Sequence, residues 1–330
     1  MAVPRFIDPA ETKFAHSRTD MGAFDKMVEM NERLAFVPEP VEDTFGTLII
    51  VGLQRSGTTL AYQIAAGGTD AGYINNLIAR FWESPAYGVY LIRHLGLRKH
   101  VSLESVYGTT ESVTDVHEFG YFWASLLGAK SNSALSEIDP EKVDWRLVRD
   151  KLLSINAAFG KPCIHKNTLA GHFMDRLGHA LDKKLFVYVK RDFLEIASSI
   201  LKVRKARYGD VNHWWSLKPR EFDRIASLSP HEQIAAQIHF LHQDLDKQAK
   251  SVPSQWLWEV SYDDICAHPS AFLMDLKDRA ARIGIEIGLS GAGAPPQSRK
   301  SALSRDDEDV RKLARCLDKY GLPYATAFKS

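Results

Sequence analysis

The stretch TLIIVGLQRSGTTLAY, residues 47–62, is the part of the chain from which the fold is most readily inferred. It begins with a short apolar run, continues through a loop bounded by Gly52 and Gly57, and ends in a helix-like pattern. A buried strand, a tight loop and a helix in this order direct successive main-chain N–H groups and the positive end of a helix at one place. The sequence therefore predicts a binding site for a phosphate-like anion at this loop.

The loop departs at one position from the pattern G-x-x-x-x-G-K-S/T, which holds the phosphates of ATP or GTP. Thr58 stands where that pattern has lysine, and Arg55 supplies a cation from inside the loop. Nucleotide triphosphatases need the lysine and a carboxylate for Mg²⁺, because the transferring phosphoryl group is highly charged. Asp192 is a candidate carboxylate, but it follows Lys190 and Arg191, which disfavours a bound cation. A sulfuryl donor fits better, since arginine, hydroxyls and N–H groups can stabilise its transfer without a metal.

Length and composition favour one large α/β domain. The chain has 330 residues, 45% hydrophobic and 25% charged, with a formal net charge of +1, which gives no general attraction for nucleic acid. The three cysteines are far apart and are expected to be free thiols in a reducing compartment. Residues 1–17 lack the apolar core of a signal peptide, and no apolar run reaches about 18 residues. We therefore expect a cytoplasmic protein without membrane insertion.

Alternating strand and helix patterns predict a doubly wound parallel sheet with a phosphate-loop-like strand–loop–helix unit. Besides the strand before Gly52, strands are expected at 161–164, 184–189 and 256–260, and helices at 144–159, 173–181, 196–203 and within 60–97. The expected organisation is a single domain of residues 1–330, with an N-terminal extension at 1–45 containing a helix at 20–34, a helical lid at about 204–250 and a loop at 287–301. Ligands of such sheets lie beyond the carboxyl ends of the strands, so the residues that follow the strands are expected to meet in one crevice.

The loop residues GLQRSGTTL, 52–60, resemble the 5′-phosphosulfate loop of sulfotransferases that use 3′-phosphoadenosine 5′-phosphosulfate (PAPS). Arginine before Ser-Gly-Thr-Thr is similar to the bacterial branch related to tyrosylprotein sulfotransferases. The resemblance spans roughly residues 46–270 and implies that PAPS is the co-substrate. It implies that the 5′-phosphosulfate is held by Arg55, Ser56, Gly57, Thr58 and Thr59.

A second motif follows the strand at 184–189. The residues RDFLEIASS, 191–199, resemble the 3′-phosphate element of the same family, in which an arginine and a serine eight residues later hold the phosphate. Arg191 at a strand end and Ser199 two helical turns later could converge on one phosphate. Phe193 stands where the family usually has proline, which loosens the match.

Two weaker similarities add further residues to the expected site. The residues VSYDD, 260–264, resemble the segment near the adenine, with Tyr262 as the matching tyrosine. The residues IHKN, 164–167, resemble the strand end whose lysine reaches the transferring group, which implies that Lys166 and Arg55 stabilise charge at the bridging oxygen.

The transfer also needs a base, because the pKa of an acceptor hydroxyl is far too high for attack at neutral pH. Glu83 is the leading candidate, since RFWESP, 80–85, resembles the Trp-Glu segment of the bacterial branch, where a glutamate serves as base. The pair His117-Glu118 and His165 are alternatives, since other sulfotransferases use histidine. The expected site contains no metal.

The acceptor is less well defined by the sequence. Trp214 and Trp215 follow the second motif and could line an acceptor pocket or form the core of the helical lid. We expect transfer to a hydroxyl, less readily to an amine, of a small molecule, lipid or glycan. An atypical phosphate-loop kinase and a non-catalytic nucleotide-binding regulatory protein are the alternative interpretations.

Overall fold

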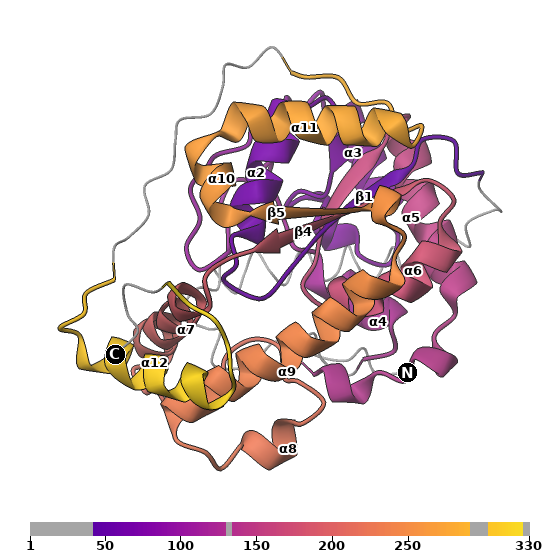
Figure 1. The fold of residues 1–330 in the computed structure, drawn as a ribbon. Coiled ribbons are helices and arrows are strands. Elements are labelled where there is room, and N and C mark those ends of the chain that lie inside the picture. Colours follow the sequence, from indigo (N-terminus) through magenta and orange to yellow (C-terminus); the bar gives the residue numbers. More distant parts are fainter. Residues whose placement is uncertain (1–41, 130–133, 291–302, 326–330) are drawn as a thin grey trace, which may run out of the picture.

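The computed structural model describes residues 42–129, 134–290 and 303–325, and it is built on one parallel sheet (Figure 1). The five strands lie in the order β2-β3-β1-β4-β5. Their bounds are β1 (Thr47–Val51), β2 (Gly72–Tyr73), β3 (Cys163–Lys166), β4 (Lys184–Lys190) and β5 (Leu257–Ser261). Helices cover both faces of the sheet, which confirms the predicted doubly wound α/β fold.

The helices that connect and cover these strands differ widely in length. Their bounds are α2 (Thr58–Gly68), α3 (Pro85–His94), α4 (Gly120–Leu126), α5 (Trp145–Phe159), α6 (Met174–Ala180), α7 (Phe193–Tyr208), α8 (Phe222–Ile225), α9 (Pro230–Ser251), α10 (Tyr262–Ala267), α11 (Pro269–Arg282) and α12 (Glu308–Lys319). Short 3₁₀ helices add η2 (Ile78–Phe81), η3 (Leu135–Glu137), η4 (Pro140–Lys142), η5 (Ala170–Phe173) and η6 (Ser254–Trp256). None of the described helices is long and apolar enough to cross a bilayer.

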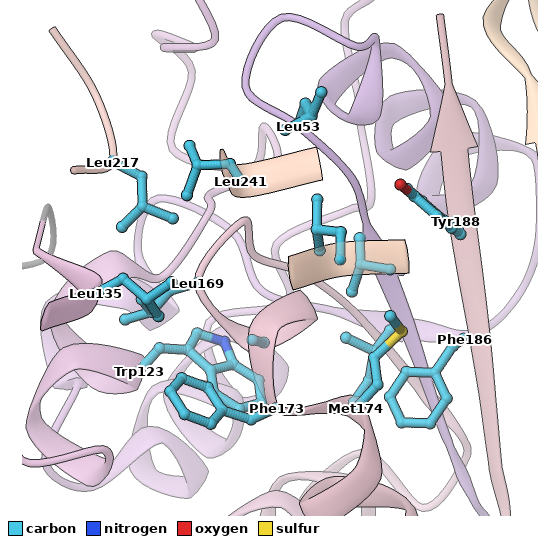
Figure 2. Packing of buried hydrophobic residues seen from close by; sticks show 14 of the residues in the cluster. Leu53, Trp123, Leu135, Leu169, Phe173, Met174, Phe186, Tyr188, Leu217 and Leu241 are labelled. Atoms are coloured by element: carbon cyan, nitrogen blue, oxygen red, sulfur yellow. The ribbon is translucent and has the colours of Figure 1, made fainter. Parts of the chain in front are cut away.

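The central strand β1 is buried along its whole length because both of its faces are covered. Leu48 and Ile50 face a core formed with α2 and α11, whereas Ile49 and Val51 face a larger core formed with helices that include α5, α6 and α9. Successive side chains of a strand point to opposite faces, so a near-continuous apolar run is what a strand buried on both faces requires. Figure 2 shows members of the larger core, including Phe186 of β4.

The order of the strands places a topological switch at β1. The chain leaves β1 towards β2 and β3 on one side, and it later reaches β4 and β5 on the other side. A crevice forms at such a point, outside the carboxyl ends of the strands, and is the usual ligand site of this architecture. The segments that follow β1, β3, β4 and β5 therefore meet at the same edge of the sheet.

The structure differs from the sequence-based expectation at two places. The helical pattern within 60–97 is interrupted by β2 and η2, because α2 ends at two consecutive glycines, Gly67 and Gly68. The strand expected at 161–164 begins two residues later, since Pro162 cannot donate to the ladder, and it includes Lys166 as its last residue. The helix expected at 20–34 and most of the loop expected at 287–301 lie outside the described residues.

The segment predicted as a helical lid is largely helical. It contains the end of α7, the short α8 and the long α9. α9 packs against α7 and α12, and these helices lie together beside the sheet in Figure 1. The division of the chain into extension, domain and lid stays a prediction.

Candidate active site

The loop between β1 and α2, residues 52–57, has an unusual backbone. Gly52 and Gly57 have φ angles of 153° and 99°, and Arg55 between them has a φ of 66°, which is uncommon for a residue with a side chain. A Cβ atom on Gly52 would lie 2.7 Å from the carbonyl oxygen of Val189 in β4. The loop therefore passes so close to the neighbouring strand that only glycine fits there.

The end of the loop leaves polar groups without protein partners. No side chain caps the N-terminus of α2, although the first N–H groups of a helix have no partner within it. The Ser56 hydroxyl is buried, and it neither donates nor accepts a hydrogen bond among the described residues. Buried polar groups normally have partners, so this arrangement fits a bound anion at the helix N-terminus.

Arg55 and Arg191 join the loop to the start of α7. The Arg55 Nε donates to the Ser199 Oγ at 2.9 Å, and the Arg191 Nη1 donates to the Arg55 carbonyl oxygen at 3.0 Å. Arg191 also forms an ion pair with Glu195 at 2.8 Å. Burial, followed by the nearby Arg191 charge, lowers the pKa of Arg55. Two guanidinium groups near one carboxylate leave an excess of positive charge, which suits an anionic ligand.

Tyr262, the first residue of α10, lies against the same loop. A Cβ atom on Gly57 would lie 2.1 Å from a Tyr262 ring carbon, so the ring packs directly on the glycine. The Arg191 guanidinium lies 4.2 Å from the ring centroid, within the range of a cation–π contact. Burial is the main cause that raises the pKa of Tyr262 to about 12, so its phenol is neutral. The structure thus brings together Arg55, Gly57, Arg191, Ser199 and Tyr262.

Lys166 ends β3 on the other side of β1 and is paired with a carboxylate. Its Nζ lies 2.6 Å from the Glu118 Oε2, with the lysine side chain 6% exposed and the glutamate 36% exposed. Burial alone would raise the pKa of Glu118, but the Lys166 ammonium and the hydrogen bonds from Thr168 hold it below its ordinary value. Glu118 is therefore an anion at neutral pH.

Glu83, the expected base, lies in the connection between η2 and α3 and is half-buried. Its main-chain carbonyl oxygen accepts a hydrogen bond from the Lys151 Nζ of α5 at 2.6 Å. The Glu83 charge is also among the influences on the Lys151 pKa, which burial lowers. These interactions connect the Glu83 segment to α5. The carboxylate that forms an ion pair with Lys166 is that of Glu118.

The two histidines considered as alternative bases are both held neutral by burial. Burial lowers the pKa of His165 to about 3 and that of His117 to about 4. His165 is 1% exposed and lies edge-on to Trp123, on the face of β3 opposite Lys166. The sequence places His165 beside Lys166, but strand alternation turns its ring into the core, which argues against His165 as the base.

A known protein family matches most of the chain. The sequence profile described as Sulfotransferase family matches residues 47–281, which include the loop, Glu118, Lys166, Arg191 and Tyr262. The chain belongs to the sulfotransferase family. The match confirms the predicted family and its transferase activity, whereas the closer link to tyrosylprotein sulfotransferases stays a prediction.

One solved structure resembles this sulfotransferase in fold, and a second shows a weaker likeness. The sulfotransferase STF9 from Mycobacterium avium is similar over 90% of this chain and 72% of its own, with a TM-score of 0.50 and 10% identity. The sulfotransferase STF1 from Mycobacterium tuberculosis H37Rv is similar over 93% of this chain and 77% of its own, with a TM-score of 0.45 and 14% identity. No curated protein sequence matches the chain.

Trp214 and Trp215, in the segment predicted as a lid, both contact neighbouring parts of the protein. Trp214 contacts the Phe222 ring of α8 edge-on, and its indole N–H donates to the Ser216 carbonyl oxygen at 3.1 Å. Trp215 is partly buried against the larger core. These contacts show how the two side chains pack, and whether they line an acceptor pocket or form the core of a lid stays open.

From the segment 101–118, the sequence pointed only to the pair His117-Glu118, and it did not place the rest of the segment near the phosphate loop. Its turn at Tyr107 and Gly108 lies beside the phosphate loop: the Arg55 guanidinium lies 5.9 Å from the Tyr107 ring centroid. A Cβ atom on Gly108 would lie 3.5 Å from the Thr59 hydroxyl. The segment is rich in hydroxyl and acidic residues, and this composition is the sequence signal that could have identified an ordered turn there. In the structure, the Asp115 carboxylate accepts three hydrogen bonds that hold the segment in place.

Proposed function

We propose that this sulfotransferase transfers a sulfuryl group from PAPS to a hydroxyl, less readily to an amine, of a small-molecule, lipid or glycan acceptor. The observation that carries the proposal is the direct contact between the two anion-binding motifs. Arg55 donates to Ser199, and Arg191 donates to the Arg55 carbonyl oxygen. A site that joins the loop to the start of α7 can hold both phosphate-bearing ends of one nucleotide.

The proposed roles follow the position of each residue. The loop, with its uncapped helix N-terminus and the free Ser56 hydroxyl, would bind the 5′-phosphosulfate. Arg191 and Ser199 would bind the 3′-phosphate, and Tyr262 would support the nucleotide. The residues proposed to bind the donor are Arg55, Ser56, Gly57, Thr58, Thr59, Arg191, Ser199 and Tyr262.

Lys166 and Arg55 are proposed to stabilise the charge that develops on the bridging oxygen as the S–O bond breaks. In an in-line displacement the acceptor oxygen forms a new bond to sulfur, and adenosine 3′,5′-bisphosphate leaves. Lysine and arginine meet this requirement with fixed positive charge, and no group of at least three metal-binding side chains occurs among the described residues. The proposal therefore assigns the charge stabilisation to protein cations.

A thermal-shift series tests the proposed donor. We expect adenosine 3′,5′-bisphosphate to stabilise the protein without Mg²⁺, and Arg191→Ala to weaken this binding about 10- to 100-fold, since hydrogen bonds to charged groups contribute about 1.5–3 kcal/mol. Arg282→Ala, at an exposed position in α11, is the matched control. Stabilisation by Mg-ATP alone would contradict the proposal and support the kinase alternative. Bisphosphate binding with no transfer to any offered acceptor would support the regulatory alternative.

The acceptor is proposed to be a cytoplasmic molecule, including glycans made on cytoplasmic carriers. Cys163, Cys266 and Cys316 are buried free thiols, which suits a reducing compartment. Incubating radiolabelled PAPS with the protein and a cell extract would reveal the labelled acceptor directly.

A further inference from the structure

The Glu118 carboxylate is oriented by three donors. One oxygen lies 2.6 Å from the Lys166 Nζ. The other accepts hydrogen bonds from the Thr168 main-chain N–H at 3.2 Å and from the Thr168 hydroxyl at 3.0 Å. Three hydrogen bonds leave part of the acceptor capacity of a carboxylate unused, and the side chain is 36% exposed. Glu118 is therefore fixed in direction yet accessible to a substrate.

The backbone around Glu118 is also constrained. Phe119 has a φ of 61°, a strained conformation for an aromatic residue that persists where its surroundings fix it. Its N–H donates to the His117 Nδ1 at 2.9 Å, and its ring stacks on Phe122 with centroids 4.3 Å apart in the core. Such strained residues gather at functional sites. The constraint holds Glu118 at the end of β3.

We propose that Glu118 is the general base of the sulfuryl transfer, in place of Glu83; this inference rests on the proposed function. The acceptor O–H would lose its proton to Glu118 while its oxygen forms a bond to sulfur. The electron pair of the breaking S–O bond stays on the 5′-phosphate oxygen of the leaving bisphosphate, which Lys166 stabilises. Atoms and charge balance without any further reactant.

The pairing with Lys166 explains how one carboxylate can be both stable and reactive. In the free protein the ammonium and the Thr168 donors hold the pKa of Glu118 below its ordinary value. When Lys166 turns towards the leaving oxygen, Glu118 loses its nearest positive charge, and the removal of an opposite charge raises the pKa of a carboxylate. The base therefore becomes stronger when donor and acceptor are both in place.

Paired variants test the assignment. Transfer of radiolabel from PAPS to a cell-extract acceptor is compared for wild type, Glu118→Gln, the rival variant Glu83→Gln and the control Glu286→Gln at an exposed position. Glu118→Gln should lower the rate about 100-fold or more, as expected for loss of a general base, and should keep the stabilisation by adenosine 3′,5′-bisphosphate. Glu286→Gln should stay within about threefold of wild type, and Glu83→Gln should lose less rate than Glu118→Gln. If Glu118→Gln retains more than about a tenth of the rate, or if Glu83→Gln loses it, the assignment is wrong.

A double variant separates a base from a residue that only holds Lys166. If Glu118 acts solely through the lysine, Lys166→Met with Glu118→Gln loses no more rate than Lys166→Met alone. The base assignment predicts a further loss of at least about tenfold. Glu118→Asp keeps the charge and guards against misfolding: it should bind the bisphosphate normally and still transfer slowly, and a wild-type rate would overturn the inference. If wild type itself transfers no label, the proposed function fails and the base assignment fails with it.

Discussion

The two sides of β1 in this sulfotransferase are charged in different ways. On the β4 and β5 side, Arg55 and Arg191 lie close to each other, and one carboxylate, Glu195, pairs with Arg191. On the β3 side, Lys166 is matched one to one by Glu118. The first arrangement leaves an excess of positive charge, while the second is a neutral pair. We propose on this basis that one side binds the donor and that the other carries out the transfer.

The largest expected effect comes from a substitution in the phosphate loop, on the proposed donor side. Gly57→Ala would place a methyl group 2.1 Å from a Tyr262 ring carbon at a φ of 99°. We expect a loss of about 2–4 kcal/mol in the free energy of unfolding, from left-handed strain and overpacking together, and loss of bisphosphate binding. Chemical denaturation and isothermal titration measure the two effects.

Gly160→Ala is the matched control for this substitution. Gly160, which ends α5, has a φ of 67°, and an added Cβ atom would meet nothing within 4 Å. The Gly160→Ala variant should lower the free energy of unfolding only by the conformational strain of about 1–2 kcal/mol, and it should leave nucleotide binding unchanged. Equal effects of the two variants would show that the contact between Tyr262 and the loop is unimportant.

A smaller expected effect is the pH dependence of stability that His165 in β3 causes. Burial lowers the pKa of His165 to about 3 from 6.5, so the unfolded chain binds a proton between these values that the folded chain does not. This residue therefore destabilises the fold increasingly as pH falls below 6.5. Relative to wild type, His165→Leu should gain about 2 kcal/mol in unfolding free energy between pH 7.5 and pH 5, at about 1.4 kcal/mol per unit.

The same His165→Leu variant separates the two faces of β3. Its sulfuryl transfer should stay close to wild type, because the ring faces the core and not Lys166. A pH-independent difference in stability would contradict the buried neutral state. A large loss of transfer with unchanged stability would restore His165 as a candidate base.

The residues that meet on the β4 side could be predicted from the sequence because each of their motifs is local. A buried strand, a glycine-bounded loop and a helix are adjacent in the chain, and Arg191 and Ser199 are two helical turns apart. Fold class and family were predicted correctly from these motifs, and the roles of the individual site residues stay predictions.

The β3 side was harder to predict because its partners are distant and irregular. Glu118 lies 50 residues from Thr168 along the chain, in a segment without helical or strand periodicity. The edge strand β2 has only two residues, too few to show an alternating pattern. Only the folded structure shows that Glu118 forms an ion pair with Lys166.

The most direct test of the donor site is isothermal titration of the wild-type protein, without Mg²⁺, with two nucleotides that differ in one phosphate. Adenosine 3′,5′-bisphosphate should bind at least about tenfold more tightly than adenosine 5′-monophosphate, because Arg191 and Ser199 add charge-assisted hydrogen bonds to the 3′-phosphate. Equal affinity for the two nucleotides would contradict the assignment of this site to PAPS.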